Sequence, residues 1–127
     1  MPTLTLHLLP DRFAVARLES TASQPPAWKA GNELLALIQT PEETTLVCRE
    51  ADIPTGYTTE VGWRALAVEG PLAFELTGIL ASLAEPLAQA GVSIFALSTY
   101  STDIILIKEN MLPHAVQALQ AAGHIIQ

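Results

Sequence analysis

The sequence predicts an α+β protein built from two halves, and two patterns carry this prediction. After Trp63 the apolar periodicity follows the order strand, helix, strand, strand, helix, strand, which is the ferredoxin-like βαββαβ pattern. Before Trp63, short strand-like segments predominate and no long helical repeat is present. We therefore expect a first half at residues 1–60 and a βαββαβ domain at residues 61–127.

Composition narrows the class of protein. The chain has 127 residues, of which 50% are hydrophobic and 15% charged, enough for one compact domain or two small halves sharing a core. The net charge is −7 and the six basic residues are scattered, which argues against binding to nucleic acid or to an anionic membrane surface. The single cysteine, Cys48, fits a reducing compartment, and the N-terminus lacks a signal-peptide pattern. We expect a cytoplasmic protein.

Strand-like segments fill the first half. Leucine alternates with polar residues over Thr3–Leu9, which is typical of a half-buried strand. The polar segment Glu19–Pro26 ends in two prolines and reads as a loop, and Ala51–Glu60, with its proline and glycine, reads as a connector. Further strands are expected at Phe13–Leu18, Leu34–Gln39 and Thr45–Arg49.

The second half begins with a strand and a helix. Trp63–Glu69 alternates weakly, and Gly70-Pro71 ends that strand. Pro86 lacks an amide hydrogen and leaves the Ser82 carbonyl without its helical partner, so we expect a kink there. Leu76–Ala90 has helical spacing with one apolar face, made of Ile79, Leu80, Leu83, Leu87 and the small Ala84 and Ala88.

A hairpin and a second helix follow. Ser93–Lys108 contains two apolar runs around a hydroxyl-rich turn, with Asp103 at the mouth of the second run. A helix is predicted from an N-cap at Asn110 to Gly123, with Pro113 tolerated in its first turn, before a last short strand at His124–Ile126. Right-handed crossovers then place both helices on one face of a four-stranded sheet.

The two halves resemble each other. Thr40–Glu50 and Thr99–Glu109 are equally long, and each runs from a threonine through a polar turn and an apolar strand to a basic residue and a glutamate. The same offset lays Leu4–Leu9 over Trp63–Val68. We therefore interpret the first half as a degenerate copy of the second half that has lost most of its helix.

The segment Gly78–Phe95, GILASLAEPLAQAGVSIF, with Ser98-Thr99-Tyr100 and Thr102-Asp103, resembles the ACT-domain family. The resemblance covers Trp63–Gly123 and is to the branch of small bacterial tandem-ACT proteins and animal cytosolic arginine sensors, and more distantly to aspartate kinase regulatory domains. It implies a degenerate ACT-like first half and a free amino acid held between paired ACT units. It also implies regulation of a partner protein without catalysis, and we expect a homodimer.

The resemblance also indicates a ligand site. In the arginine sensors the acid of the Ser-Thr-Tyr-x-Thr-Asp segment contacts the positive end of the ligand, and that position here is Asp103. In those sensors the loop before the first helix of the ACT unit also contacts the ligand, and the matching loop here is Glu69–Gly78. The carboxylate of a zwitterion suits the amides of a helix start, and its ammonium suits a carboxylate. The candidate ligand-binding residues are Asp103, Gly78, Thr77, Glu75, Thr102 and Ser98.

Other readings stay open. Asp103 equally suits a turn cap, the turn hydroxyls suit local hydrogen bonds, and Glu75 suits a solvated position. An alternative function is a protein interaction module with a vestigial pocket, which predicts a seam filled by side chains. An enzyme would need a second activated polar group within reach of Asp103, and the sequence indicates none. The histidines lack metal spacing, so no metal or cofactor is predicted.

Overall fold

The computed structural model describes residues 2–18 and 33–127, which fall into two compact units. Unit 1 is Met1–Pro10 with Arg64–Gln127, and unit 2 is Asp11–Trp63. The predicted boundary near residue 60 lies close to the one found, but residues 1–10 belong with the second half of the chain. The loop expected at Glu19–Pro26 lies outside the described residues.

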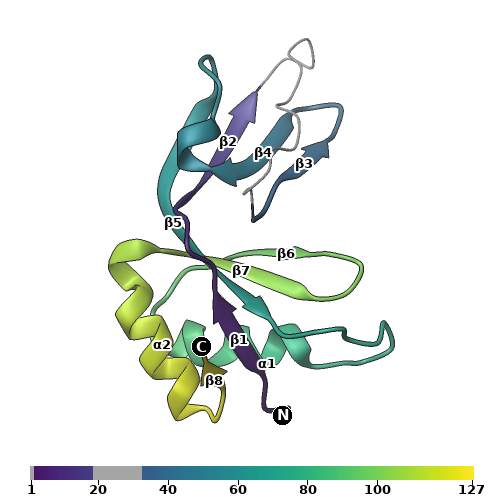
Figure 1. The fold of residues 1–127 in the computed structure, drawn as a ribbon, viewed down its shortest axis with the longest axis vertical. Coiled ribbons are helices and arrows are strands. Elements are labelled where there is room, and N and C mark those ends of the chain that lie inside the picture. The colour runs from purple at the N-terminus through teal and green to yellow at the C-terminus, as the bar shows by residue number, and fades with distance from the viewer. Residues whose placement is uncertain (1, 19–32) are drawn as a thin grey trace. The chain divides into compact units, whose positions relative to one another are not determined.

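Unit 1 contains a sheet and two helices in the predicted order (Figure 1). Its sheet has the spatial order β8-β1-β5-β7-β6. The start of β5 belongs to unit 2 and its end belongs to unit 1. The elements are β1 (Thr5–Leu8), the end of β5 (Thr58–Val68), α1 (Ile79–Gln89), β6 (Phe95–Ser98), β7 (Asp103–Lys108), α2 (Leu112–Ala121) and β8 (Ile125–Ile126).

The prediction of a four-stranded sheet is wrong, because the sheet of unit 1 contains one more strand. β1 lies between β5 and β8, antiparallel to β5 with Leu6 opposite Val68 and parallel to β8 with Leu6 opposite Ile126. Leu6 is fully buried in this position. The alternation of leucines in β1 predicted a half-buried strand, but gave no information on which strands it pairs with.

Both helices pack against one face of the unit 1 sheet, as predicted. Their apolar side chains share a core with residues that alternate along the strands. Leu80 and Ala88 are exceptions, since both were expected on the packed face of α1 but are exposed, Leu80 by 41%. The buried cluster comprises Leu4, Leu6, Leu66, Val68, Ile79, Leu83, Leu87, Val92, Ile105, Ile107, Ala115 and Leu119.

The carbonyl freed by Pro86 has a partner from another element. Nε2 of His124 lies 2.9 Å from the Ser82 carbonyl oxygen, and the Leu4 amide donates to Nδ1 of His124 at 3.1 Å. Because Nδ1 accepts, the ring proton lies on Nε2, which donates to the carbonyl. The buried His124 thus takes the place of the missing amide hydrogen of Pro86 and ties α1 to the segment before β1.

The second helix begins later than predicted. A 3-10 turn, η2 (Glu109–Met111), follows β7, and the Leu112 amide bonds the Glu109 carbonyl. Met111 occupies the N-cap of α2 and provides no side-chain cap, so the Asn110 cap is wrong. Pro113 lies in the first turn, as expected. In the described residues, neither helix has the length and hydropathy of a membrane span.

Unit 2 is an antiparallel sheet in the order β3-β4-β2-β5, made of β3 (Ala36–Gln39), β4 (Thr44–Arg49), β2 (Phe13–Leu18) and the start of β5. The connector predicted at Ala51–Glu60 is partly wrong. It contains a 3-10 turn, η1 (Glu50–Asp52), and β5 begins at Thr58 because residues 58–60 pair with β2.

The strands repeat with a constant spacing. β3, β4 and η1 begin at residues 36, 44 and 50, and β6, β7 and η2 begin at 95, 103 and 109, an offset of 59 in each case. The same offset lays β1 over the part of β5 that belongs to unit 1, as predicted for Leu4–Leu9 and Trp63–Val68. The equal spacing supports the internal repeat predicted from sequence.

Candidate functional site

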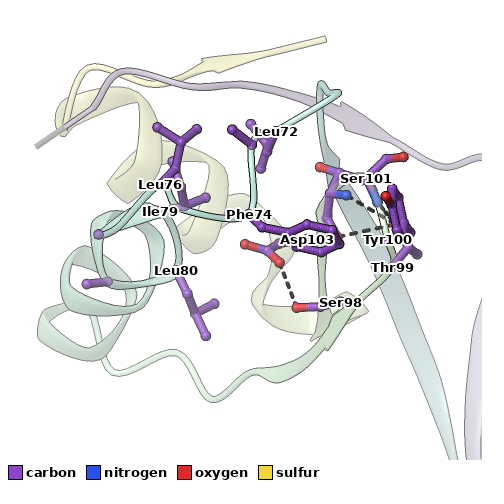
Figure 2. Close-up of a pocket in the computed structure, with 14 residues that line it drawn as sticks. Leu72, Phe74, Leu76, Ile79, Leu80, Ser98, Thr99, Tyr100, Ser101 and Asp103 are labelled. Atoms are coloured by element: carbon purple, nitrogen blue, oxygen red, sulfur yellow. Dashed lines mark hydrogen bonds between the residues drawn. The ribbon is translucent and has the colours of Figure 1, made fainter.

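A cavity of about 350 Å³ lies in unit 1 between the start of α1 and the turn that joins β6 to β7. Figure 2 shows its side chains, and we refer to it as the hairpin cavity. Three segments line it: the loop before α1 with Leu72, Ala73, Phe74, Leu76 and Gly78, the first turn of α1 with Ile79, Leu80 and Ala81, and the hairpin turn with Ser98–Asp103.

The hairpin turn is organised by Thr99. Its amide donates to the Thr102 carbonyl at 2.8 Å, and its hydroxyl oxygen accepts from the amides of Ser101 and Thr102 at 3.3 and 3.1 Å. These are the local hydrogen bonds between side chain and backbone that the hydroxyl-rich tract predicted. It fixes the direction in which Asp103, the first residue of β7, leaves the turn.

The loop before α1 is attached to this turn. The Leu72 amide donates to the Ser101 carbonyl at 2.7 Å, and the Thr102 hydroxyl donates to the Val68 carbonyl at 2.5 Å. A Cβ placed on Gly70 would lie 2.9 Å from the Ser101 carbonyl oxygen, so this approach requires glycine. The two walls of the hairpin cavity are therefore held together by hydrogen bonds to backbone carbonyls.

Asp103 presents one carboxylate oxygen for a ligand. Oδ1 accepts a hydrogen bond from the Ser98 hydroxyl at 2.6 Å, across the last pair of the β6–β7 ladder. Within the part of the chain that the structure describes, Oδ2 has no hydrogen-bond partner. The side chain is half-buried and lines the cavity, so this oxygen can accept from a bound cation.

The start of α1 supplies the opposite polarity. Gly78 is the N-cap in the left-handed region, with φ of 79°, and makes no side-chain cap. The Ser82 amide makes a hydrogen bond to the Gly78 carbonyl, so the three preceding amides of Ile79, Leu80 and Ala81 lack helical acceptors. These residues line the cavity, and free amides at a helix start favour an anionic group.

Sequence reasoning missed the apolar part of the site. Phe74, Leu76 and Leu80 line the cavity although each is exposed, and Phe74 meets Tyr100 edge-on with ring centroids 4.7 Å apart (Figure 2). A signal was present in Leu72–Leu76, which places three large apolar residues at alternate positions in the loop between Gly70-Pro71 and the helix.

Four of the six predicted ligand residues meet at the hairpin cavity: Gly78, Ser98, Thr102 and Asp103. The Thr102 and Ser98 hydroxyls donate to other groups of the protein, so they position the walls of the site. Glu75 and Thr77 are exposed and do not line the cavity. Among the described lining residues, Asp103 is the only carboxylate and none is basic, and the described chain holds no metal-binding group of three acidic, histidine or cysteine residues.

Comparison with known proteins shows which family this sequence matches. The sequence model of the ACT domain matches residues 58–121. The chain is 30% identical over 141 residues to the cytosolic arginine sensor for mTORC1 subunit 1 of Bos taurus, covering 91% of this chain and 42% of that protein. It thus spans less than half the length of that sensor.

Solved structures share the fold. The crystal structure of protein Atu0741 from Agrobacterium tumefaciens superposes with a TM-score of 0.89 and 33% identity, covering 100% of this chain and 94% of that one. The regulatory subunit of aspartate kinase from Thermus thermophilus gives a TM-score of 0.60 at 11% identity, covering 89% and 93% of the two chains, which is a likeness of fold alone. With the ACT model matching half of the sequence, the chain belongs to the ACT-domain family.

Proposed function

We propose that this protein is a non-catalytic regulatory ACT protein that binds a free amino acid in the hairpin cavity. One observation carries the proposal: the cavity joins the free amides at the start of α1 to the unpaired Oδ2 of Asp103. The ligand's carboxylate accepts from the amides, and its ammonium donates to Asp103. The relative named as an arginine sensor supports a regulatory role without catalysis.

The contacts are sufficient in number for the affinity of a sensor. Micromolar binding needs about 8 kcal/mol, and a hydrogen bond to a charged group contributes roughly 1.5–3 kcal/mol. Three or four such bonds, with some apolar burial, reach that value. The hairpin cavity offers the three amides of the first turn of α1 and one carboxylate oxygen.

Regulation requires that the ligand favours one state of the protein over another. We propose that the favoured state is an association state. In it the ACT unit contacts either a second copy of this chain, in a homodimer, or a regulated partner protein. The cytosolic location named for the arginine sensor supports a cytoplasmic protein. Sedimentation velocity with and without ligand reports whether binding changes the association state.

Isothermal titration calorimetry against the twenty amino acids tests the site. Asp103→Asn keeps the shape of the side chain and removes its charge, so we expect binding to weaken by at least about tenfold. Glu75→Gln is the matched control, because it removes an exposed acid that does not line the cavity, and its affinity should equal that of the wild type. Heat from none of the amino acids, or wild-type affinity in Asp103→Asn, contradicts the proposal.

A protein interaction module is the second candidate function. The exposed side chains of Phe74, Leu76 and Tyr100 favour it, because clustered apolar surface is typical of interaction sites. The open cavity favours a ligand, because a vestigial pocket would be filled by side chains. Amino-acid-independent association abolished by Leu76→Gln, with no ligand binding, would identify the module.

A further inference from the structure

We propose that the hairpin cavity selects an α-amino acid with an uncharged, apolar side chain, in the class of leucine, methionine and norleucine. This inference rests on the proposed function and names the ligand class of that same site. It separates the chain from its relative named as an arginine sensor, whose ligand carries a second positive charge.

The α-ammonium and the α-carboxylate of an amino acid pair with all the charged and dipolar groups that the cavity offers to a ligand. The ammonium pairs with Asp103, the only carboxylate among the described lining residues, and the carboxylate pairs with the free amides of α1. No carboxylate is left for a lysine or arginine side chain, and no basic residue for an aspartate or glutamate side chain. A charge taken from water without a partner is costly, so a charged side chain is disfavoured.

The remaining wall is apolar and exposed. Eight large apolar side chains of the described residues are exposed, and four of them line this one cavity. Their exposed fractions are 71% for Phe74, 52% for Leu76, 41% for Leu80 and 82% for Tyr100. A ligand side chain lying against these residues removes apolar surface of both partners from water, which is favourable in proportion to the area.

The occupant must also suit Asp103. An apolar surface of another protein pressed onto the cavity would bury Oδ2 of Asp103 without a partner, which is unfavourable. A free amino acid brings its own ammonium to that oxygen and its own apolar group to the exposed wall. The volume of about 350 Å³ is at the small end of ligand pockets, which suits a single amino acid.

Norleucine and lysine form the decisive pair of probes, because their four-carbon side chains differ only by the terminal ammonium. Calorimetric titration of the full chain should show norleucine binding at least about tenfold more tightly than lysine. Hexanoate, which lacks the α-ammonium, should not bind measurably. Arginine and glutamate should bind as weakly as lysine.

A variant sharpens the test. Leu80→Glu places an acid in the exposed first turn of α1, where a negative charge is compatible with the helix, and should shift the preference toward lysine. Leu80→Gln has nearly the same shape without the charge and should not give this shift. Tighter binding of lysine or arginine than of norleucine by the wild type overturns the inference and leaves the proposed function standing. Absence of binding by every amino acid overturns both.

Discussion

The β3–β4 and β6–β7 hairpins have the same turn but differ in the pair of residues next to it. In unit 2 the Thr40 amide donates to the Glu43 carbonyl at 2.9 Å, and its hydroxyl accepts from the amides of Glu42 and Glu43 at 3.3 and 3.2 Å. In unit 1 Thr99 makes the same three bonds 59 residues later. The turn itself therefore does not distinguish a ligand site from an ordinary hairpin.

The pair of residues that closes each hairpin makes the difference. In unit 1 Ser98 lies opposite Asp103, whose carboxylate reaches the hairpin cavity. In unit 2 Gln39 lies opposite Thr44, which is 2% exposed. The Thr44 hydroxyl is buried and has no hydrogen-bond partner among the described residues. One half carries an accessible acid and the other a buried hydroxyl at the same position of the repeat.

The segments after the hairpins also diverge. Pro54 and Pro113 occupy equivalent positions after the 3-10 turns η1 and η2. Pro113 begins α2, because proline is compatible with a first helical turn. After Pro54 the chain reaches Gly56, with φ of 93°, and enters β5 at Thr58. Gly56 lies two residues after Pro54 in a left-handed conformation, and a turn and a strand follow there in place of a helix.

The largest expected effect concerns the helical layer, which belongs to unit 1 among the described residues. His124→Ala removes the partners of the Ser82 carbonyl and the Leu4 amide, both buried, so we expect the free energy of unfolding to fall by about 3–5 kcal/mol in urea titrations. Pro86→Ala restores an amide to α1 next to that carbonyl. The double variant should recover about 1 kcal/mol relative to His124→Ala. Strict additivity of the two changes would show that Pro86 and His124 are not coupled through Ser82.

A smaller effect is expected from giving unit 2 the acid of unit 1. Thr44→Asp places a carboxyl group in a buried position without a described partner, which should lower the free energy of unfolding by roughly 2–3 kcal/mol and create no second ligand site. Thr44→Val removes the unpaired hydroxyl and should leave stability unchanged or slightly higher. Urea unfolding measures both. A fully stable Thr44→Asp would mean that this position is open to solvent.

Much of the fold could be predicted from local pattern. Alternating leucines gave β1, helical spacing gave α1 and α2, and the equal lengths of Thr40–Glu50 and Thr99–Glu109 gave the repeat. The insertion of β1 between β5 and β8 could not be predicted, because strand order depends on tertiary pairing rather than on periodicity. The early start of β5 was missed for the same reason.

The candidate site was predicted in its polar part and missed in its apolar part. Asp103 and Gly78 come from turn chemistry and a helix start, which leave local signals in sequence. The exposure of Leu80 leaves none, because helical spacing places it on the apolar face with Leu83 and Leu87, and only the path of the preceding loop opens that end of the face.

Backbone amide shifts during a norleucine titration test the central claim most directly, because both hairpins are followed in one NMR experiment. We predict that the amides of Ile79, Leu80 and Thr99–Asp103 shift together with one saturating curve, while those of Thr40–Thr44 do not move. Shifts of equal size in both hairpins, or no shifts at the start of α1 for any amino acid, would contradict the account.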